Sequence, residues 1–293
     1  MKLKDFALLV LICLMWGASN VVSKLVVGHW GVPPLYFAAV RFALVLLVTL
    51  PWLLPVPQPV WRILLVGLCM GAGNFALLFM GLQTASPSSV AVVVQAGLPI
   101  TTLLSIVMLG ERVHWRRGLG IALTLIGVLI VVWKPGFALS AGLMFVLGAA
   151  FAGSLGAILM KQMDEIAPMR FQAWVGLTAV VPLTVASLLF EEGQIVTSLA
   201  AGWPFVAALL FSALIVSVCA HTAYYGLIAK YEANLLAPLT LITPLSTIAL
   251  GVMFTGDQLD GRMILGSALA LAGVLIVAVR RTRAPIAETQ EHA

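Results

Sequence analysis

The sequence predicts an all-α integral membrane protein with ten transmembrane helices in two five-helix inverted repeats. Of its 293 residues, 62% are apolar and 9% are charged, and the mean hydropathy is +1.11. Ordinary globular domains are about half apolar and about a quarter charged. The apolar residues form ten stretches near the length that spans a bilayer, about 20 residues, and parts of the first half recur in the second. This composition excludes a disordered chain, a coiled coil and a disulfide scaffold, and it disfavours a soluble enzyme.

Each apolar stretch is expected to be one helix, and turn residues such as Pro33-Pro34 and Gly256 separate most neighbours. The first stretch follows Lys2 and Lys4, as a signal peptide would. It is longer than a typical signal-peptide core and more spans follow, so we expect it to remain as an uncleaved helix. The predicted spans are residues 6–27, 33–54, 61–82, 87–109, 118–134, 138–160, 169–190, 204–229, 233–255 and 262–280.

Lysine and arginine predict the orientation of these spans, because such residues collect on cytoplasmic loops. With the N-terminus inside, only Lys24, Lys134 and Arg262 lie on the outer side, while Arg41 lies within a span. The cytoplasmic set is Lys2, Lys4, Arg62, Arg112, Arg116, Arg117, Lys161, Arg170, Lys230, Arg280, Arg281 and Arg283. We therefore expect both termini in the cytoplasm, in a multi-pass protein of the inner or plasma membrane. The net charge of +5 reflects topology and predicts no nucleic-acid partner.

An internal repeat relates the two halves of the chain. The segment 110–131 matches 256–277 at one constant offset, and Pro99 matches Pro244 further upstream. Five spans per copy is an odd number, so the second copy must enter the membrane from the opposite side. A pseudo-two-fold axis in the membrane plane then relates the halves, as in many secondary transporters, whose substrate site lies between them.

The repeat also predicts the domain organisation. The first five-helix repeat is expected to cover residues 1–134 and the second 135–280, followed by a polar cytoplasmic tail at 281–293. The three cysteines, Cys13, Cys69 and Cys219, lie singly within apolar runs. They therefore suggest neither a metal site nor a disulfide framework.

Two stretches resemble a known family. The run Trp-Gly-Ala-Ser-Asn at 16–20, followed by Lys24, resembles the first-helix signature of the drug/metabolite transporter superfamily. The run 81–111, from Gly81-Leu82 through Pro99 to Gly110-Glu111, resembles a second signature. Over essentially its whole length the chain resembles two copies of the EamA type and is similar to YddG-like exporters of aromatic and other amino acids. The resemblance implies ten helices around a central cavity, an exporter and no cofactor.

Polar side chains inside a bilayer are costly and tend to face a cavity or another helix. Trp16, Ser19, Asn20 and Ser23 share one face of the first helix, because they are spaced i, i+3, i+4 and i+7. We interpret this face as a cavity wall in which Asn20 bonds the substrate. Helix–helix packing is the alternative, since small and polar residues are also common there.

Prolines mark a second pair of candidates. Gln95 lies four residues before Pro99, and Thr240 lies four residues before Pro244. A proline within a helix leaves the carbonyl four residues earlier without its partner. Kinks at Pro99 and Pro244 would therefore expose the carbonyls of Gln95 and Thr240 to a substrate, unless neighbouring side chains satisfy them.

Aromatic and hydrogen-bonding residues in three other spans complete the predicted substrate site. They could hold a substrate with an apolar side chain and a polar end, although packing or lipid-facing roles are the alternative. These residues are Asn74 and Phe75 in the third span, Trp174 in the seventh, and His221, Tyr224 and Tyr225 in the eighth.

Arg41 is the charged candidate. Its planar guanidinium could bind a substrate carboxylate, or it could bond helix-end carbonyls and fix the fold. No Asp or Glu lies within a predicted span, and a proton-coupled carrier usually holds a titrating group near its substrate site. We therefore expect facilitated transport. The spans also lack a cluster of basic residues for sugar phosphates, so zwitterionic amino acids fit better.

The sequence thus predicts an exporter of small amphipathic solutes, chiefly amino acids, that works by alternating access through a central cavity in the lipid bilayer. A nucleotide-sugar or drug carrier of the same superfamily is the alternative within transport. An intramembrane hydrolase is an alternative of another class, because Ser154 and His221 supply a nominal Ser–His pair. However, Ser154 does not lie in the GxSxG pattern of such hydrolases, and a hydrolase would leave the internal repeat unexplained.

Overall fold

Helices make up nearly all of the structure, a computed structural model that describes residues 1–110, 115–134, 138–231 and 233–278. Within these ranges, nine helical segments are long and apolar enough to cross a membrane. The predicted span 233–255 is present as two shorter helices, α13 (Ala233–Leu239) and α14 (Ile242–Thr255). The prediction of an all-α membrane protein is confirmed. The predicted tail, 281–293, lies outside the described residues.

The first half runs from α1 to α7. Its elements are α1 (Leu3–Lys24), η1 (Leu25–His29), α2 (Pro34–Thr49), η2 (Leu50–Trp52), α3 (Val60–Gly67), η3 (Leu68–Gly73), α4 (Asn74–Thr84), α5 (Pro87–Val93), η4 (Val94–Ala96), α6 (Gly97–Leu109) and α7 (Trp115–Val132). The second half starts with a short antiparallel pair and contains the remaining helices. Its elements are β1 (Trp133–Lys134), β2 (Ala138–Leu139), α8 (Ala141–Met160), α9 (Pro168–Phe190), α10 (Gln194–Ala201), α11 (Trp203–Leu210), η5 (Phe211–Ala220), α12 (His221–Lys230), α13, α14 and α15 (Gly261–Ala278).

Proline and glycine set several helix ends. Helices α2, α5 and α9 begin at Pro34, Pro87 and Pro168, because the fixed φ of proline suits the first helical turn, where an N–H has no partner. Helices α6 and α14 are each followed directly by a glycine, Gly110 and Gly256, which adopt φ values of 68° and 67°. Glycine takes this left-handed conformation at no steric cost and so terminates the helix.

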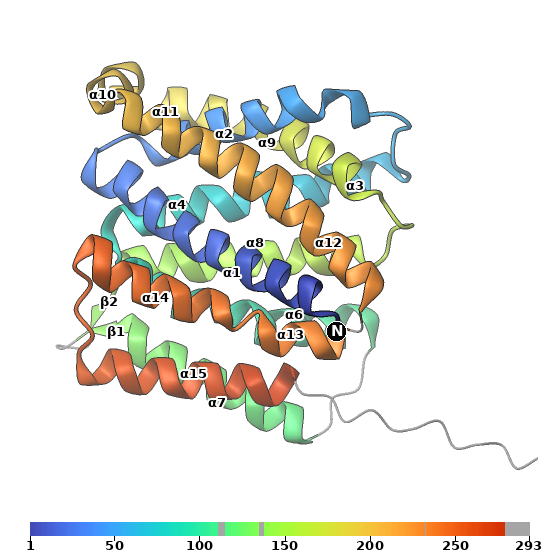
Figure 1. Cartoon of the computed structure of the whole chain (residues 1–293), viewed down its shortest axis with the longest axis vertical. Coiled ribbons are helices and arrows are strands. Elements are labelled where there is room, and N and C mark those ends of the chain that lie inside the picture. Colours follow the sequence, from blue (N-terminus) through green and yellow to red (C-terminus); the bar gives the residue numbers. More distant parts are fainter. Residues whose placement is uncertain (111–114, 135–137, 232, 279–293) are drawn as a thin grey trace, which may run out of the picture.

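The helices run side by side, with α7 and α15 at one edge of the bundle and α2 and α9 towards the other (Figure 1). Between these pairs, α1 packs against α14 and α4 packs against α8. The N-terminus lies at the same end of the bundle as the end of α12, and an ion pair of 2.6 Å joins Lys230 Nζ to Asp5 Oδ2 there. Helix α10 lies at the opposite end.

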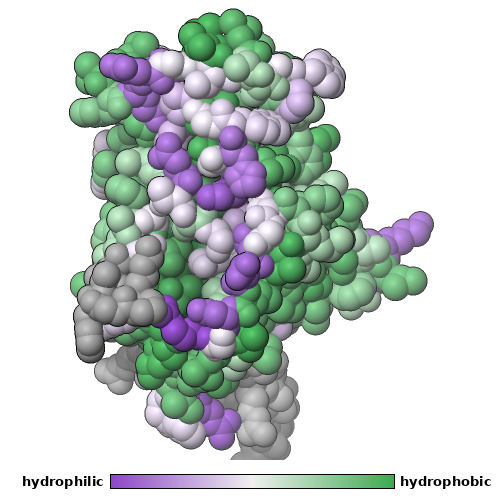
Figure 2. Space-filling view, turned by 90° about the vertical axis from the view of Figure 1, so that its left-hand side faces the viewer, coloured by the Kyte–Doolittle hydropathy of each residue, from purple (hydrophilic) through white to green (hydrophobic). Residues whose placement is uncertain are grey.

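Polar and apolar surface are separated as a bilayer requires. Figure 2 shows one end of the bundle, where hydrophilic residues form a band down the end face and hydrophobic residues cover the flanks. Many large apolar side chains are exposed, including Val107 at 82% and Met253 at 73%. Soluble monomers rarely expose contiguous apolar surface on this scale, so lipid is the natural cover.

Helices α7 and α15 approach closely through glycine. A Cβ atom on Gly127 would lie 2.5 Å from the carbonyl oxygen of Gly266, and one on Gly273 would lie 2.6 Å from that of Gly120. Between these contacts, Thr124 Oγ1 lies 3.5 Å from the carbonyl oxygen of Ala270. Small residues let two membrane helices bring their backbones together, which gains van der Waals contact that lipid cannot supply.

We predict that Gly127→Ala destabilises the protein, because the added methyl group must push α15 away. Overpacking of this kind costs about 1–3 kcal/mol, which exceeds the gain of about 1 kcal/mol in helix propensity. The measurement is the midpoint of thermal unfolding in detergent. Gly118→Ala on the same helix is the control, since nothing lies within 4 Å of a Cβ there. Equal midpoints for the two variants would contradict the tight contact.

Candidate functional site

A cavity of about 210 Å³ lies between helices of the first and second halves of the chain. Five of the ten lining residues are aromatic or aliphatic, and amide, hydroxyl and imidazole groups supply the polar parts. The lining residues are Phe42 of α2, Met70 of η3, Asn74 and Phe75 of α4, Gly153 of α8, Phe171, Gln172 and Val175 of α9, Ser217 of η5 and His221 of α12. This mixture can hold an apolar group while orienting a polar one.

The two spans that supply most of the polar wall each contain a π-helical segment. Segment η3 ends at Gly73, directly before Asn74, and segment η5 ends at Ala220, directly before His221. Such wider turns are frequent at functional sites. The Nδ1 atom of His221 lies 2.7 Å from the carbonyl oxygen of Val216, within η5. Because a carbonyl oxygen only accepts, Nδ1 is the donor, and Nε2 of the neutral ring is then an acceptor.

Arg41 lies directly behind this wall. Its side chain is 1% exposed, and its Nε and Nη2 atoms donate to Ser217 Oγ at 3.2 and 2.9 Å. The guanidinium carbon lies 4.6 Å from the ring centre of Phe75 and 5.8 Å from that of Phe79. Among the described residues no carboxylate pairs with it. Within the described part of the chain, the charge of Arg41 is compensated at close range by a hydroxyl dipole and two aromatic faces.

Two amide side chains of the wall keep hydrogen-bonding capacity. Asn74 Nδ2 donates to the carbonyl oxygen of Ala149 at 2.7 Å, and no described residue donates to its Oδ1. Gln172 is 6% exposed, yet its amide has no hydrogen-bond partner within the described part of the chain. The cavity thus combines a nearby positive charge with neutral groups that are open to a ligand.

The structure brings Asn74, Phe75 and His221 together at the cavity, with Arg41 behind them. Trp16 is next to this group, since its ring centre lies 5.2 Å from that of His221 and 4.9 Å from that of Tyr224. Trp16 and Tyr224 therefore extend the cluster but do not line the cavity.

Three other predicted residues lie elsewhere or outside what is described. Asn20 Nδ2 donates to Thr247 Oγ1 at 3.3 Å and so joins α1 to α14. Trp174 Nε1 donates to the carbonyl oxygen of Leu53 at 3.0 Å, which ties α9 to the segment after α2. The side chain of Tyr225 lies outside the described part of the structure.

The two proline-containing spans are interrupted where Gln95 and Thr240 lie. Gln95 is within the short 3-10 turn η4, and Thr240 is in the turn between α13 and α14. Neither residue lines the cavity. The expected open carbonyl at Thr240 is not found, because it accepts from the backbone N–H of Thr243 at 2.9 Å. The chain satisfies that group locally by tightening the turn ahead of Pro244.

Sequence reasoning did not select Gln172 as a substrate-site residue. Ser217 lies one turn before His221 on the polar face of the eighth span, and this helical spacing is the signal for it. Gln172 lies near the start of α9, where a polar residue looks like an ordinary helix end. Only the packing of α9 shows that its side chain is buried against the cavity.

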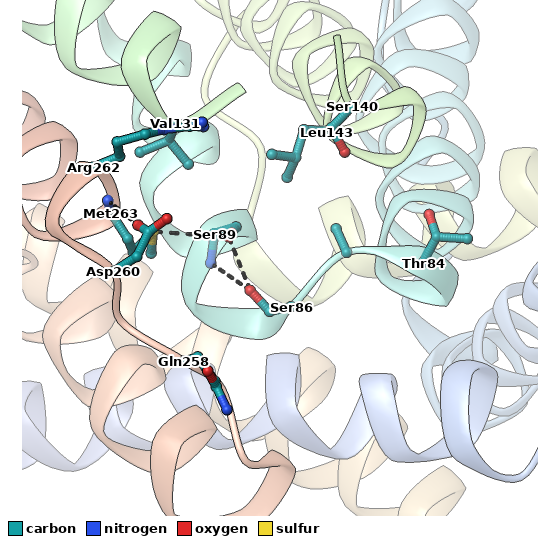
Figure 3. Close-up of a pocket in the computed structure, with 11 residues that line it drawn as sticks. Thr84, Ser86, Ser89, Val131, Ser140, Leu143, Gln258, Asp260, Arg262 and Met263 are labelled. Atoms are coloured by element: carbon teal, nitrogen blue, oxygen red, sulfur yellow. Dashed lines mark hydrogen bonds between the residues drawn. The ribbon is translucent and has the colours of Figure 1, made fainter. Parts of the chain in front are cut away.

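A second cavity, of about 250 Å³, lies at the end of the bundle where α5, α8 and α15 begin (Figure 3). Its wall is polar, and within it the N–H of Ser89 donates to Ser86 Oγ at 3.2 Å. Asp260 and Arg262 line it from the start of α15. It contains none of the predicted site residues, and the hydroxyl groups of Ser86 and Ser89 bond each other at 2.9 Å. The cavity beside Arg41 is therefore the better candidate for a substrate site.

Comparison with known proteins identifies the family. The model of the EamA-like transporter family matches twice, over residues 4–133 and 140–279. The chain belongs to the EamA-like transporter family. This EamA-like transporter is 30% identical to a probable amino-acid metabolite efflux pump of Salmonella typhimurium, over 96% of the chain and 98% of that protein. It is 29% identical to a protein of the same description from Escherichia coli, over 94% and 95% of the two chains.

Less similar proteins support the same family assignment. The EamA-like transporter is 27% identical to the uncharacterized inner membrane transporter YedA of Escherichia coli, over 87% of the chain and 84% of the relative. A solved crystal structure shares its fold, with a TM-score of 0.63 and 18% identity over 94% and 96% of the two chains. The prediction of an EamA-type member of the drug/metabolite transporter superfamily is confirmed.

The family assignment excludes the alternative that the protein is an intramembrane hydrolase. Members of this family are transporters and not enzymes. The geometry agrees, because Ser154 Oγ donates to the carbonyl oxygen of Gly97 at 2.9 Å and His221 bonds Val216. The nominal Ser–His pair therefore makes no described contact. The EamA-like transporter is a multi-pass membrane protein that carries a small molecule.

Proposed function

We propose that this transporter exports small zwitterions, chiefly amino acids, by alternating access through the cavity beside Arg41. The observation that carries the proposal is the buried guanidinium without a carboxylate partner among the described residues. An isolated charge in a membrane protein interior is expensive and is usually functional. A substrate carboxylate would compensate this charge when the cavity is occupied. The names of the two similar efflux pumps support the same substrate class.

The size and wall of the cavity favour an amino acid over the alternatives. Its volume is about 210 Å³, whereas drug-sized ligands occupy pockets of roughly 300–1,000 Å³. A nucleotide sugar exceeds this space and would need more positive charge than Arg41 provides. Phe42, Met70 and Phe171 offer an apolar surface for a neutral amino-acid side chain.

The inverted repeat supplies the mechanism of alternating access. We infer that the halves are related by a pseudo-two-fold axis that passes between α7 and α15. Thr124 and Ala270 are separated by the same offset that relates the repeated segments 110–131 and 256–277, and they contact each other. Two-fold related positions can meet in this way only near the axis. The two matches of the family model, one in each half, also support the repeat.

The distribution of basic residues and one similar protein support a location in the inner membrane. We infer an inner-membrane protein with both termini in the cytoplasm, on the strength of the Lys/Arg asymmetry and the inner-membrane relative YedA. The two halves would rock about the cavity and expose it to one side at a time.

We predict that Arg41→Met abolishes measurable transport of L-leucine while leaving thermal stability unchanged or higher. Truncating one member of a charge pair costs about 2–5 kcal/mol of binding, whereas replacing a buried charge by an apolar group is often neutral or stabilising. Counterflow of radiolabelled L-leucine in proteoliposomes and the unfolding midpoint in detergent provide the two readouts. Arg116→Met, at an exposed position, is the matched control. Retained leucine transport together with a large loss of stability would make Arg41 a structural residue.

We also predict facilitated transport, without coupling to protons. Histidine is the side chain whose unperturbed pKa lies nearest neutral pH, and His221 is the one histidine among the residues that line the cavity. None of these lining residues is a carboxylate that could stabilise a charged imidazole. At fixed solute concentrations, uptake into proteoliposomes should not respond to an imposed pH gradient. Accumulation driven by that gradient and lost in His221→Ala would overturn this prediction and identify His221 as the coupling residue.

A further inference from the structure

We propose that Gln172, together with Asn74 and His221, forms an ammonium subsite that makes the cavity selective for zwitterions over simple carboxylates. This inference rests on the proposed function and assigns the second end of the substrate. Gln172 is its central residue, because its side chain lines the cavity and no described residue bonds its amide.

Gln172 stands out because its amide lies at the cavity wall and bonds no described residue. The side chain is 6% exposed and lines the cavity, and no described residue bonds its amide. Buried polar groups are nearly always hydrogen-bonded, since leaving one unpaired costs free energy. Trp174, two residues along α9, bonds the carbonyl oxygen of Leu53 instead. A ligand in the cavity is thus the natural partner of Gln172.

Asn74 and His221 each present an acceptor at the wall, while the Ser217 hydroxyl is engaged with Arg41 and the carbonyl oxygen of Ser212. Asn74 uses its Nδ2 for the carbonyl oxygen of Ala149, which leaves Oδ1 as an acceptor. His221 uses its Nδ1 for the carbonyl oxygen of Val216, which leaves Nε2 as an acceptor. An ammonium group has three N–H donors and no acceptor. Gln172 Oε1, Asn74 Oδ1 and His221 Nε2 match that requirement in number and kind.

The charge distribution favours a zwitterion in particular. The acceptors are neutral, so they can solvate an ammonium group but cannot balance its charge. Arg41 lies behind Ser217 and Phe75, and it would repel a ligand that carries positive charge alone. A solute with both a carboxylate and an ammonium group satisfies the acceptors and Arg41 together. A simple amine leaves the charge of Arg41 uncompensated, and a simple carboxylate leaves the acceptors without a donor.

The test compares two ligands of one shape, L-leucine and its 2-hydroxy analogue, in which a hydroxyl group replaces the ammonium group. Affinities are measured on the purified full-length protein from the concentration dependence of ligand-induced thermal stabilisation. The proteins are the wild type, Gln172→Leu, the near-isosteric Gln172→Glu, and Gln162→Leu as a matched control. Gln162 lies in the turn after α8 and does not line the cavity.

We expect Gln172→Leu to lose affinity for L-leucine by about tenfold, with a much smaller change for the hydroxy analogue, because only the ammonium group loses a buried hydrogen bond. Gln172→Glu keeps the packing and adds negative charge, so it should increase the preference for L-leucine. Gln162→Leu should match the wild type. An equal loss of both ligands in Gln172→Glu would show that the amide binds the carboxylate instead, and would overturn the subsite.

Two further outcomes separate the subsite from the proposed function. If wild-type protein binds both ligands and Gln172→Leu binds them as the wild type does, the subsite is wrong while carboxylate recognition stands. If wild-type protein binds neither ligand, the proposed amino-acid function fails, and the ammonium subsite fails with it.

Discussion

The arrangement of the cavity depends on one buried guanidinium. Arg41 is withdrawn from water and lipid, held by two hydrogen bonds to Ser217 and placed against the face of Phe75. Removing such a group from water costs several kcal/mol even after relaxation. Neutral partners return only part of that cost. The protein therefore holds a site whose electrostatics improve when an anionic group enters the cavity.

The fold positions this charge through close helix packing and through two interrupted spans. Helix α2, which carries Arg41, packs against α9, which carries Gln172. Gly176 permits that contact, because a Cβ there would lie 3.2 Å from the backbone nitrogen of Leu46. The π-helical segments η3 and η5 then bring Asn74, Ser217 and His221 to the same cavity. One helix pair and two wider turns thus assemble the polar wall.

Hydropathy predicted the helical membrane fold well, because a bilayer imposes a strong requirement for long apolar segments. Prediction of the site was less complete. Helical spacing identifies which residues share a face, but it does not say what covers that face. The face of Asn20 meets Thr247 of α14, and the indole of Trp174 meets a main-chain carbonyl. The sequence does not indicate that Gln172 is buried, because burial near a helix end depends on tertiary packing alone.

If a ligand carboxylate compensates Arg41, the protein should distinguish L-leucine from leucinol, which keeps the side chain and the ammonium group but lacks the carboxylate. The measurement is calorimetric titration of each ligand into the purified wild-type protein. We expect L-leucine to bind and leucinol to show no detectable binding, because its net positive charge faces the guanidinium. If leucinol binds as tightly as L-leucine, no carboxylate compensates Arg41, and the residue has a role in the fold alone.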